Sequence, residues 1–422
     1  MSNRVSFDLI SVPEEWSIIP CGVFFKQKSI KNTEGEMNLS VYRDYGVIPK
    51  DSRDDNHNRV SEDTSNYKLV EPGDFVLNKM KGWSGSLGVS EYRGIVSPSY
   101  TVLEPVREIH NKYFHYLLRS ETYRQMYESL SYGVRIGQWE LHYHDFKQIP
   151  SLYPPIDEQE LISRYLDKKT EQVDSLIEKI QKKIELLKEK RTSLINHYVT
   201  KGLDPNVEMR ESEIDWVGRI PTDWKCLPLK FISEINTGTT PKTSNTDFYN
   251  GGQHLWIKPG NLNEFCEILD TEQKLTPLGL EESRLLDKNS VLICGIGTIG
   301  KFGFSSQMVT TNQQIHGVCF DSTRLNPRYG LYLCSIMTEE LIKNSEKVVI
   351  SILNKGNLER LKIPVPSLSE QNQIVNFLET KVSSTTRRIE LETQKADLLD
   401  EYLQSLISSV VTGKIRVTED MI

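Results

Sequence analysis

Two stretches of the chain, residues 157–169 (DEQELISRYLDKK) and 369–381 (SEQNQIVNFLETK), are copies of one another and decide the fold. Glu158-Gln159 in the first matches Glu370-Gln371 in the second, at an offset of 212 residues (370 minus 158). The match needs no gap. The sequence therefore contains an internal repeat, which predicts a duplicated architecture.

The repeat continues on both sides of these stretches. VTKGL at 199–203 matches VTGKI at 411–415 at the same offset, and VPEEWSIIP at 12–20 resembles IPTDWKCLP at 220–228. The intervening stretches are dissimilar, so variable domains alternate with conserved segments. The predicted order is a variable domain at 1–154, a conserved helix at 155–201, a linker at 202–215, a variable domain at 216–366, a conserved helix at 367–413 and a tail at 414–422.

The conserved segments read as long helices. Asp157 with Glu160 forms the pattern of a capping box, and Ser369 is placed to cap the second helix. Neither segment contains proline or glycine until Gly202 and Gly413, where glycine stops are expected. A helix of about 45 residues is about 65 Å long.

Apolar residues recur at alternating spacings of four and three along both segments, which is typical of a coiled-coil seam. One charged residue interrupts each seam, Arg191 in the first and Glu392 in the second. A coil between two chains would satisfy this pattern. We favour an antiparallel coil within one chain, because the repeat supplies two similar seams. The seam residues are Val173, Ile177, Ile180, Ile184, Leu187, Leu194, Ile389, Leu399, Leu403 and Leu406.

The variable domains combine strands with helices, so the predicted fold class is α/β (α+β). Strand and turn patterns cover 75–105 in the first domain and 254–320 in the second, and each is followed by a helical stretch, at 111–130 and 327–346. The expected architecture is two pseudo-symmetric domains separated by two long helices.

Length and composition bound the function further. A chain of 422 residues is too long for one typical domain. The six cysteines form no CxxC pair, there is no signal-peptide pattern, and no stretch reaches 18 apolar residues, so we expect a reduced cytoplasmic protein without a membrane span or metal. The formal net charge of −7 argues against a uniformly basic DNA binder, but local charge and partners decide binding.

Three short motifs read more readily as structure than as chemistry. Gly295, Gly297 and Gly300 spell GxGxxG, but a strand-like stretch follows instead of the helix that a phosphate loop needs. The stretch 326–329 (NPRY) nearly matches the base-holding motif of amino-methylating DNA methyltransferases, but Arg328 replaces a proline. His142 and His144 would share one strand face without a third metal ligand.

Four loops combine cations, amides and hydroxyls with glycine or aromatic residues. Lysine and arginine suit guanine edges and phosphates, whereas asparagine and glutamine suit adenine edges. Ordinary solvated loops could have the same composition, and residues 312–314 could instead satisfy buried backbone groups. The candidate DNA-contacting residues are Lys79, Lys81, Ser84, Arg135, Gln138, Lys258, Asn261, Lys301, Asn312, Gln313 and Gln314.

The whole pattern resembles the specificity subunit of type I restriction-modification systems. The resemblance rests on VPEEW and IPTDWK, the paired EQ helix starts, VTKGL and VTGKI, together with WIKPGNL at 256–262, GTIGK at 297–301 and TNQQ at 311–314. It implies two target recognition domains, each reading half of a split site in double-stranded DNA, with the helices as an antiparallel spacer.

The same resemblance implies two methylation subunits docked on this framework, and restriction/translocase subunits that join for cleavage. AdoMet, ATP and magnesium would then belong to partners, and this chain would be a non-catalytic scaffold without a cofactor. Two alternatives remain open here: a DNA adenine methyltransferase built around the NPRY stretch, and a coiled-coil adaptor without DNA contacts. AdoMet binding by the isolated chain would identify the first.

Overall fold

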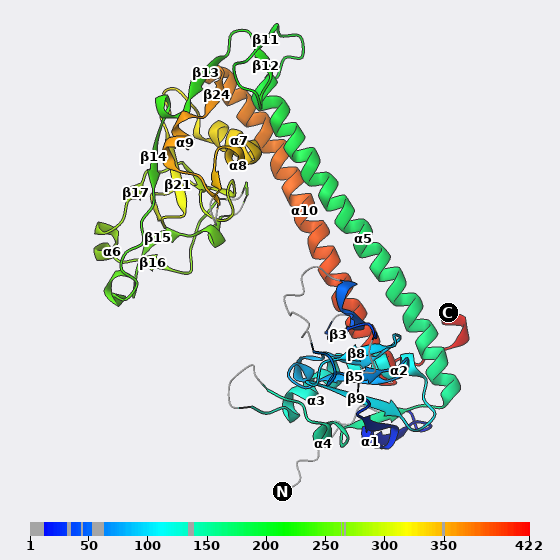
Figure 1. Ribbon diagram of the computed structural model, residues 1–422. Coiled ribbons are helices and arrows are strands. Elements are labelled where there is room, and N and C mark those ends of the chain that lie inside the picture. The colour runs from blue at the N-terminus through cyan, green and yellow to red at the C-terminus, as the bar shows by residue number, and fades with distance from the viewer. Residues whose placement is uncertain are drawn as a thin grey trace. The chain divides into compact units, whose positions relative to one another are not determined.

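The computed structural model describes residues 12–31, 35–43, 45–52, 63–133, 139–262, 264–265, 267–347 and 351–422. The chain divides into two compact units, the first formed by 1–180 with 394–422 and the second by 181–393 (Figure 1). Both units have the mixed α/β composition that the sequence predicts. Within the described residues, no helix is both long and apolar enough to cross a bilayer.

The first unit is built on an antiparallel sheet with the strand order β2-β9-β6-β7. These strands are β2 (Phe25–Lys28), β9 (Tyr100–Pro105), β6 (Phe75–Asn78) and β7 (Leu87–Val89). Three strand pairs complete the unit: β1 (Ser17–Pro20) with β10 (Pro150–Tyr153), β3 (Leu39–Tyr42) with β4 (Gly46–Pro49), and β5 (Lys68–Val70) with β8 (Gly94–Val96).

Short helices accompany this sheet, and α1 to α4 bury apolar side chains in the core of the unit. They are α1 (Cys21–Phe24), η1 (Lys50–Ser52), η2 (Gly82–Ser84), α2 (Asn111–Arg119), α3 (Glu121–Leu130) and α4 (Tyr143–Phe146). Phe25, Phe75, Phe114 and Phe146 are fully buried, and their ring centroids lie 5.3–5.5 Å from their neighbours. Aromatic contacts of this kind dominate core energetics in small domains.

The second unit repeats this topology in a chain of different sequence. Its sheet has the order β14-β21-β18-β19, formed by β14 (Ser233–Thr237), β21 (Ile315–Phe320), β18 (Ser290–Cys294) and β19 (Phe302–Ser305). A second sheet contains β16 (Lys274–Leu275), β15 (His254–Ile257), β20 (Val309–Thr311) and β17 (Leu285–Leu286). The strands β13 (Lys225–Pro228) and β24 (Lys362–Val365) pair as β1 and β10 do.

The remaining elements of the second unit are short helices and two further strand pairs, β11 with β12 and β22 with β23. They are β11 (Met209–Glu211), β12 (Arg219–Pro221), η3 (Leu229–Phe231), η4 (Thr246–Phe248), η5 (Pro259–Asn261), α6 (Pro277–Glu281), α7 (Pro327–Ile336), α8 (Thr338–Lys343), β22 (Glu346–Lys347), β23 (Ser351–Ile352) and α9 (Lys355–Arg360). The predicted linker at 202–215 contains β11, which pairs with β12.

The long helices α5 (Ile156–Lys201) and α10 (Leu368–Val411) occupy the predicted positions, but their caps differ from the prediction. Asp157 lies inside α5, since the helix begins at Ile156. α10 likewise begins before Ser369, and Ser367 instead accepts a hydrogen bond from the Glu370 amide (3.3 Å). Pro155 directly precedes α5, and Pro366 lies two residues before the start of α10, where proline is readily accommodated at a helix entry.

The predicted glycine stops are confirmed. Gly202 and Gly413 have φ values of +78° and +76°, in the left-handed region that ends helices. Both lie beside a tryptophan of the repeat, Trp224 for Gly202 and Trp16 for Gly413.

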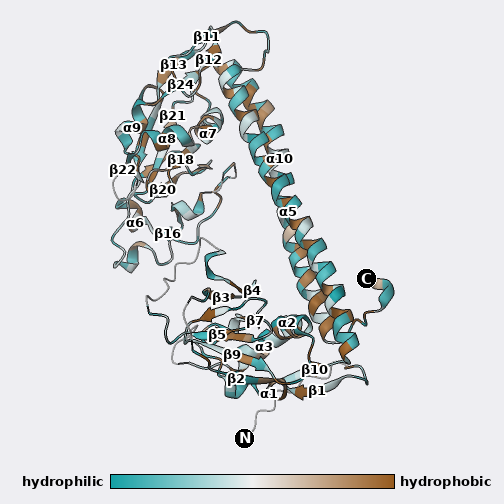
Figure 2. Ribbon diagram, turned by 45° about the vertical axis from the view of Figure 1, so that its right-hand side comes forward, coloured by the Kyte–Doolittle hydropathy of each residue, from teal (hydrophilic) through white to brown (hydrophobic). Residues whose placement is uncertain are grey.

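In the second unit the two long helices pair as an antiparallel coil. Lys183 donates to Glu392, Arg191 donates to Thr386, and the ring of Tyr198 lies 4.5 Å from that of Phe377, so numbers rise along α5 as they fall along α10. Figure 1 shows the two helices side by side, and Figure 2 shows hydrophobic and hydrophilic residues alternating along both. All ten predicted seam residues are buried or half-buried.

The two charged seam positions do not face each other. Arg191 lies level with Thr386, whereas Glu392 lies level with Lys183, eight residues away along α5. At 1.5 Å per residue these levels are about 12 Å apart. Each charge therefore has a polar neighbour of its own in the coil.

A polar junction joins each long helix to its unit and explains the repeated motifs. The indole of Trp16 donates to Glu158 (3.0 Å), and that of Trp224 donates to Glu370 (3.0 Å). The neighbouring glutamine is fully buried in both copies and bonds the backbone before α2 or α7: Gln159 accepts from the His110 amide, and Gln371 from the Asn326 amide. The tryptophan and the EQ pair are thus the two halves of one contact.

Candidate functional site

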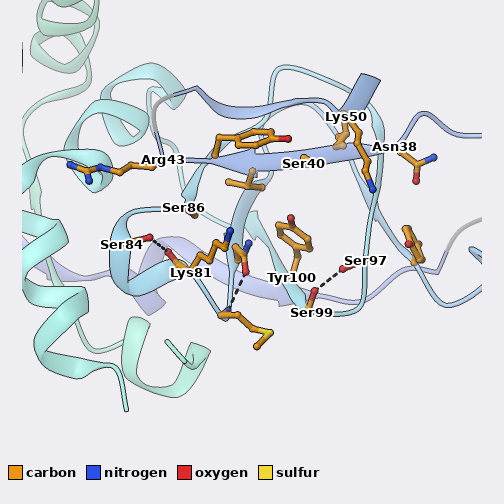
Figure 3. Close-up of a pocket in the computed structure, with 16 residues that line it drawn as sticks. Asn38, Ser40, Arg43, Lys50, Lys81, Ser84, Ser86, Ser97, Ser99 and Tyr100 are labelled. Atoms are coloured by element: carbon orange, nitrogen blue, oxygen red, sulfur yellow. Dashed lines mark hydrogen bonds between the residues drawn. The ribbon is translucent and has the colours of Figure 1, made fainter. Parts of the chain in front are cut away.

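A cavity of about 640 Å³ opens in the first unit beside β3 and the loops that join β6 to β7 and β8 to β9. Figure 3 shows polar side chains from these segments around it. The lining combines three cations with amides, hydroxyls and tyrosines: Arg43, Lys50 and Lys81; Asn38 and Asn78; Ser40, Ser84, Ser86, Ser97 and Ser99; Tyr42, Tyr67 and Tyr100. Such a mixture suits a polyanion that also presents hydrogen-bonding edges.

The β6–β7 loop owes its shape to bonds within itself. The Ser84 hydroxyl donates to the Lys81 carbonyl (2.8 Å), and the Trp83 indole donates to the Met80 carbonyl (3.2 Å). Gly85 turns the chain with a φ of +91°. Lys81 is exposed at the cavity as a result. The hydroxyl hydrogen of Ser84 is already used in its bond to the Lys81 carbonyl.

Other cavity groups are positioned by the neighbouring loop. Ser97 and Ser99 share a hydrogen bond of 2.6 Å, and the Lys79 amide donates to the Ser99 carbonyl (3.3 Å). The side-chain oxygen of Asn38 is buried and has no hydrogen-bond partner among the described residues. Burial lowers the pKa of Lys68, and the nearby positive charge of Lys79 lowers it further.

In the second unit the predicted residues of three loops come together. Lys301 donates to the Pro259 carbonyl (3.0 Å), which joins the β18–β19 loop to η5. The ammonium group of Lys258 lies 4.6 Å from the Trp256 ring centroid, and Asn261 accepts from the Lys258 amide (2.9 Å). The Asn312 amide donates to the Ile257 carbonyl (3.0 Å), which brings in the β20–β21 loop.

Residues 312–314 divide between structure and surface. Asn312 is 7% exposed, donates to the Gln314 side chain (2.9 Å) and accepts from the Gln314 amide (3.1 Å). Gln313 is exposed and accepts a hydrogen bond from Thr240, on a loop that the sequence reasoning did not single out. Asn312 and Gln314 therefore shape a turn that presents Gln313.

The two sites use equivalent connections, because the units share one topology. The β6–β7 and β8–β9 loops of the first unit correspond to the β18–β19 and β20–β21 loops of the second. Sequence reasoning missed several cavity residues of the first unit, among them Asn38, Arg43, Lys50, Ser97 and Ser99. The correspondence of residues 97–99 with 312–314 follows from the strand topology, because each stretch directly precedes an equivalent strand, β9 or β21.

The other predicted residues and motifs fall as follows. Arg135 and Gln138 lie outside the described residues. His142 and His144 do not share a strand, because His142 caps α4 and His144 lies within it; among the described residues no group of three metal-ligating side chains occurs. The GxGxxG glycines occupy the β18–β19 hairpin, and Asn326 caps α7 by accepting from the Arg328 amide (2.8 Å).

The family model for the type I restriction modification DNA specificity domain matches residues 13–186 and 221–399. The chain belongs to this family. It is a type I restriction-modification DNA specificity subunit with two recognition domains.

Named relatives agree with this assignment. The MjaVIII type I restriction enzyme specificity subunit of Methanocaldococcus jannaschii is 24% identical over 97% of this chain and 95% of its own length. The putative MjaX specificity subunit of the same organism is 23% identical over 84% of this chain and 81% of its own. The EcoBI specificity subunit of Escherichia coli is 26% identical over 62% and 57%.

A solved structure supports the fold of the specificity subunit. A chain from a study of complex assembly and conformational transition of the type I R-M system superposes with a TM-score of 0.70 at 14% identity, over 96% of this chain and 100% of that one. Neither the methyltransferase nor the adaptor alternative finds support in these matches.

Proposed function

We propose that this specificity subunit reads a split site in double-stranded DNA, with the cavity of the first unit on one half-site and the Lys258–Lys301–Gln313 cluster on the other. The supporting observation is that equivalent loops of both units carry cations beside amides or hydroxyls. Cations hold phosphates and guanine edges, and amides bond adenine edges. Unlike loop sequences in the two units suit unlike half-sites.

The proposal uses the domain boundaries that were predicted from the amino-acid sequence. Recognition domains at 1–154 and 216–366 would be separated by the helices at 155–201 and 367–413, with the linker at 202–215 and the tail at 414–422. A coil fixed by buried seams would set the half-site separation, as dimer geometry does in simpler DNA readers.

The same proposal assigns chemistry to partners. Two methylation subunits would dock on this framework, restriction/translocase subunits would join for cleavage, and AdoMet, ATP and magnesium would bind to those subunits. This chain would act in the cytoplasm without catalysing a step itself. Partner cations would offset its net charge of −7 in a clamp around DNA.

Neutralising the candidate cations together tests the proposal. The full chain, co-expressed with its methylation subunits, would select fragments from a pool of random duplexes, and sequencing would reveal the enriched motif. The variant with alanine at Lys79, Lys81, Arg135, Lys258 and Lys301 should enrich no motif, because charge and direct readout are lost together. Enrichment of an unchanged motif would refute the loop assignment. AdoMet bound by the isolated chain would favour the methyltransferase alternative.

A further inference from the structure

Two arginines that stand out in the sequence converge on one short segment of the second unit. Arg191 interrupts the apolar seam of α5, and Arg328 replaces a proline in the NPRY stretch. Both contact the segment between η5 and β16, of which residues 264, 265 and 267 are described. Each arginine pairs with a carboxylate outside its own helix, Arg191 with Glu264 and Arg328 with Glu267.

Arg191 joins this segment to the coil. Its side chain is 9% exposed, and its guanidinium group donates to Thr386 on α10 (3.1 Å) and to Glu264 (3.5 Å). The same group lies 4.4 Å from the ring centroid of Phe265. A planar guanidinium can make these contacts at once, whereas an ammonium group cannot.

Arg328 makes a parallel set of contacts from α7. Its guanidinium group lies 3.4 Å from a carboxylate oxygen of Glu267 and 4.0 Å from one of Glu379 on α10. The group also lies 4.2 Å from the ring centroid of Phe304. Each arginine therefore bridges the segment to α10 and rests on an aromatic ring.

The segment itself adopts a conformation that its neighbours must impose. Phe265 has a φ of +60°, which bulky residues rarely adopt unless packing determines it. Its ring lies 5.1 Å from that of Phe302 and 6.3 Å from that of Tyr332. Beyond it, the Ile268 amide donates to the Phe304 carbonyl (2.9 Å), which fixes the segment to β19.

The clamped segment lies directly after the proposed DNA-contacting residues. Only Leu262, which is 3% exposed, and Asn263, outside the described residues, separate Asn261 from Glu264. We propose that Arg191 and Arg328 are positioning residues that anchor this loop to the coiled coil, so that Lys258 and Asn261 meet the second half-site in a fixed geometry. The proposal rests on the proposed function, and it adds a physical link between the spacer and the reading loop.

The test uses Arg191→Leu and Arg328→Leu in the full chain, co-expressed with its methylation subunits. Arg191→Leu makes the seam more apolar, so a purely structural view predicts an unchanged or higher unfolding midpoint. The positioning role predicts about tenfold weaker binding to the mapped duplex. It also predicts that each mismatched base pair in the half-site read by the second unit reduces the affinity by a smaller factor than in the unmodified chain. Mismatch penalties in the other half-site should be unchanged.

Matched variants sharpen the test. Lys183→Leu removes a coil contact with Glu392 on the same stretch of α5 and should leave binding unchanged. Arg191→Lys keeps the positive charge but lacks the planar guanidinium group, so it should bind the duplex more tightly than Arg191→Leu and more weakly than the unmodified chain. Because Arg191 would act through the loop that carries Lys258, the two substitutions should not be additive. Lys258→Ala should reduce affinity less in the Arg191→Leu chain than in the unmodified chain.

Hydrogen exchange of the DNA-free protein separates this proposal from the proposed function. The backbone amides of Lys258 and of residues 260–262 should exchange at least tenfold faster in Arg191→Leu and Arg328→Leu than in the unmodified chain, with first-unit amides unchanged. Unchanged exchange rates, or additive effects of Arg191→Leu and Lys258→Ala on affinity, would overturn the proposal that Arg191 and Arg328 position this loop. Faster exchange in a protein that recognises no split site would support the clamp and refute the proposed function.

Discussion

Gln371 is fully buried at the start of α10, and its replacement by alanine should destabilise the second unit strongly. Its side-chain nitrogen donates to the carbonyls of Pro366 (2.9 Å) and Arg324 (3.1 Å), and its oxygen accepts from the Asn326 amide (2.7 Å). Alanine removes all three bonds and leaves a space that water can only partly fill.

The expected loss follows from these groups. A buried amide left without a partner costs about 1–3 kcal/mol, and a carbonyl, which tolerates an unfilled lone pair more readily, costs less. The sum is about 3–5 kcal/mol, a large share of the roughly 5–15 kcal/mol that holds a domain folded. Protection of α7 amides from hydrogen exchange should then fall by a factor of roughly 10² to 4 × 10³.

Native-state hydrogen exchange read by mass spectrometry is the assay, because it reports on the second unit separately. Gln373→Ala, at an exposed position two residues along the same helix, is the control and should change stability by less than about 0.5 kcal/mol. Gln159→Ala should have the equivalent effect in the first unit, where Gln159 bonds Pro154 (2.8 Å) and the His110 amide (3.0 Å). A loss below about 1 kcal/mol in Gln371→Ala would refute the role assigned to the repeated glutamine.

Three further predictions follow from the junctions and the cavity. Burial raises the pKa of Glu370, so the folded state holds its proton more tightly than the unfolded state does. The free energy of unfolding of the unmodified chain, relative to that of Glu370→Gln, should therefore fall as pH rises from the ordinary carboxyl pKa through the raised pKa. A difference in urea midpoints between the two proteins that does not change with pH would contradict this. Gly413→Ala should destabilise the first unit by about 1–2 kcal/mol or more, since φ is +76° and a β-carbon would lie 2.5 Å from Pro13; thermal unfolding without a shift would be inconsistent with that backbone. Lys81→Ala should weaken DNA binding at all sequences and lower the slope of log affinity against log salt by about 0.9 if it holds one phosphate; an unchanged slope in a salt titration would remove Lys81 from the interface.

The features that sequence predicts well here are those set by local pattern. The seams of α5 and α10 and the stops at Gly202 and Gly413 depend on residues a few positions apart, so periodicity and backbone preference suffice. The caps were misplaced because proline admits a helix start that the spacing of Asp157 and Glu160 does not reveal.

The cavity proposed as the first recognition site was harder to predict because long-range strand pairing assembles it. Asn38 and Ser97 are brought to one cavity by β3 and β8, and no local motif connects them. In the second domain, composition identified the loop 312–314 but could not tell that Asn312 turns inward and Gln313 outward. Sequence also could not predict that Arg191 pairs with Glu264 and Arg328 with Glu267. A charged residue in a helix indicates that it needs a partner, but local sequence does not identify which residue that partner is.

Mapping modified adenines in a host genome, after co-expression of this chain with its methylation subunits, tests the central claim most directly. Two half-sites separated by a gap of fixed length should emerge. Exchange of residues 216–366 for the equivalent domain of a relative should change one half-site and leave the other half and the gap intact. A continuous motif, or a change in both halves after the exchange, would contradict the account of two separate recognition domains.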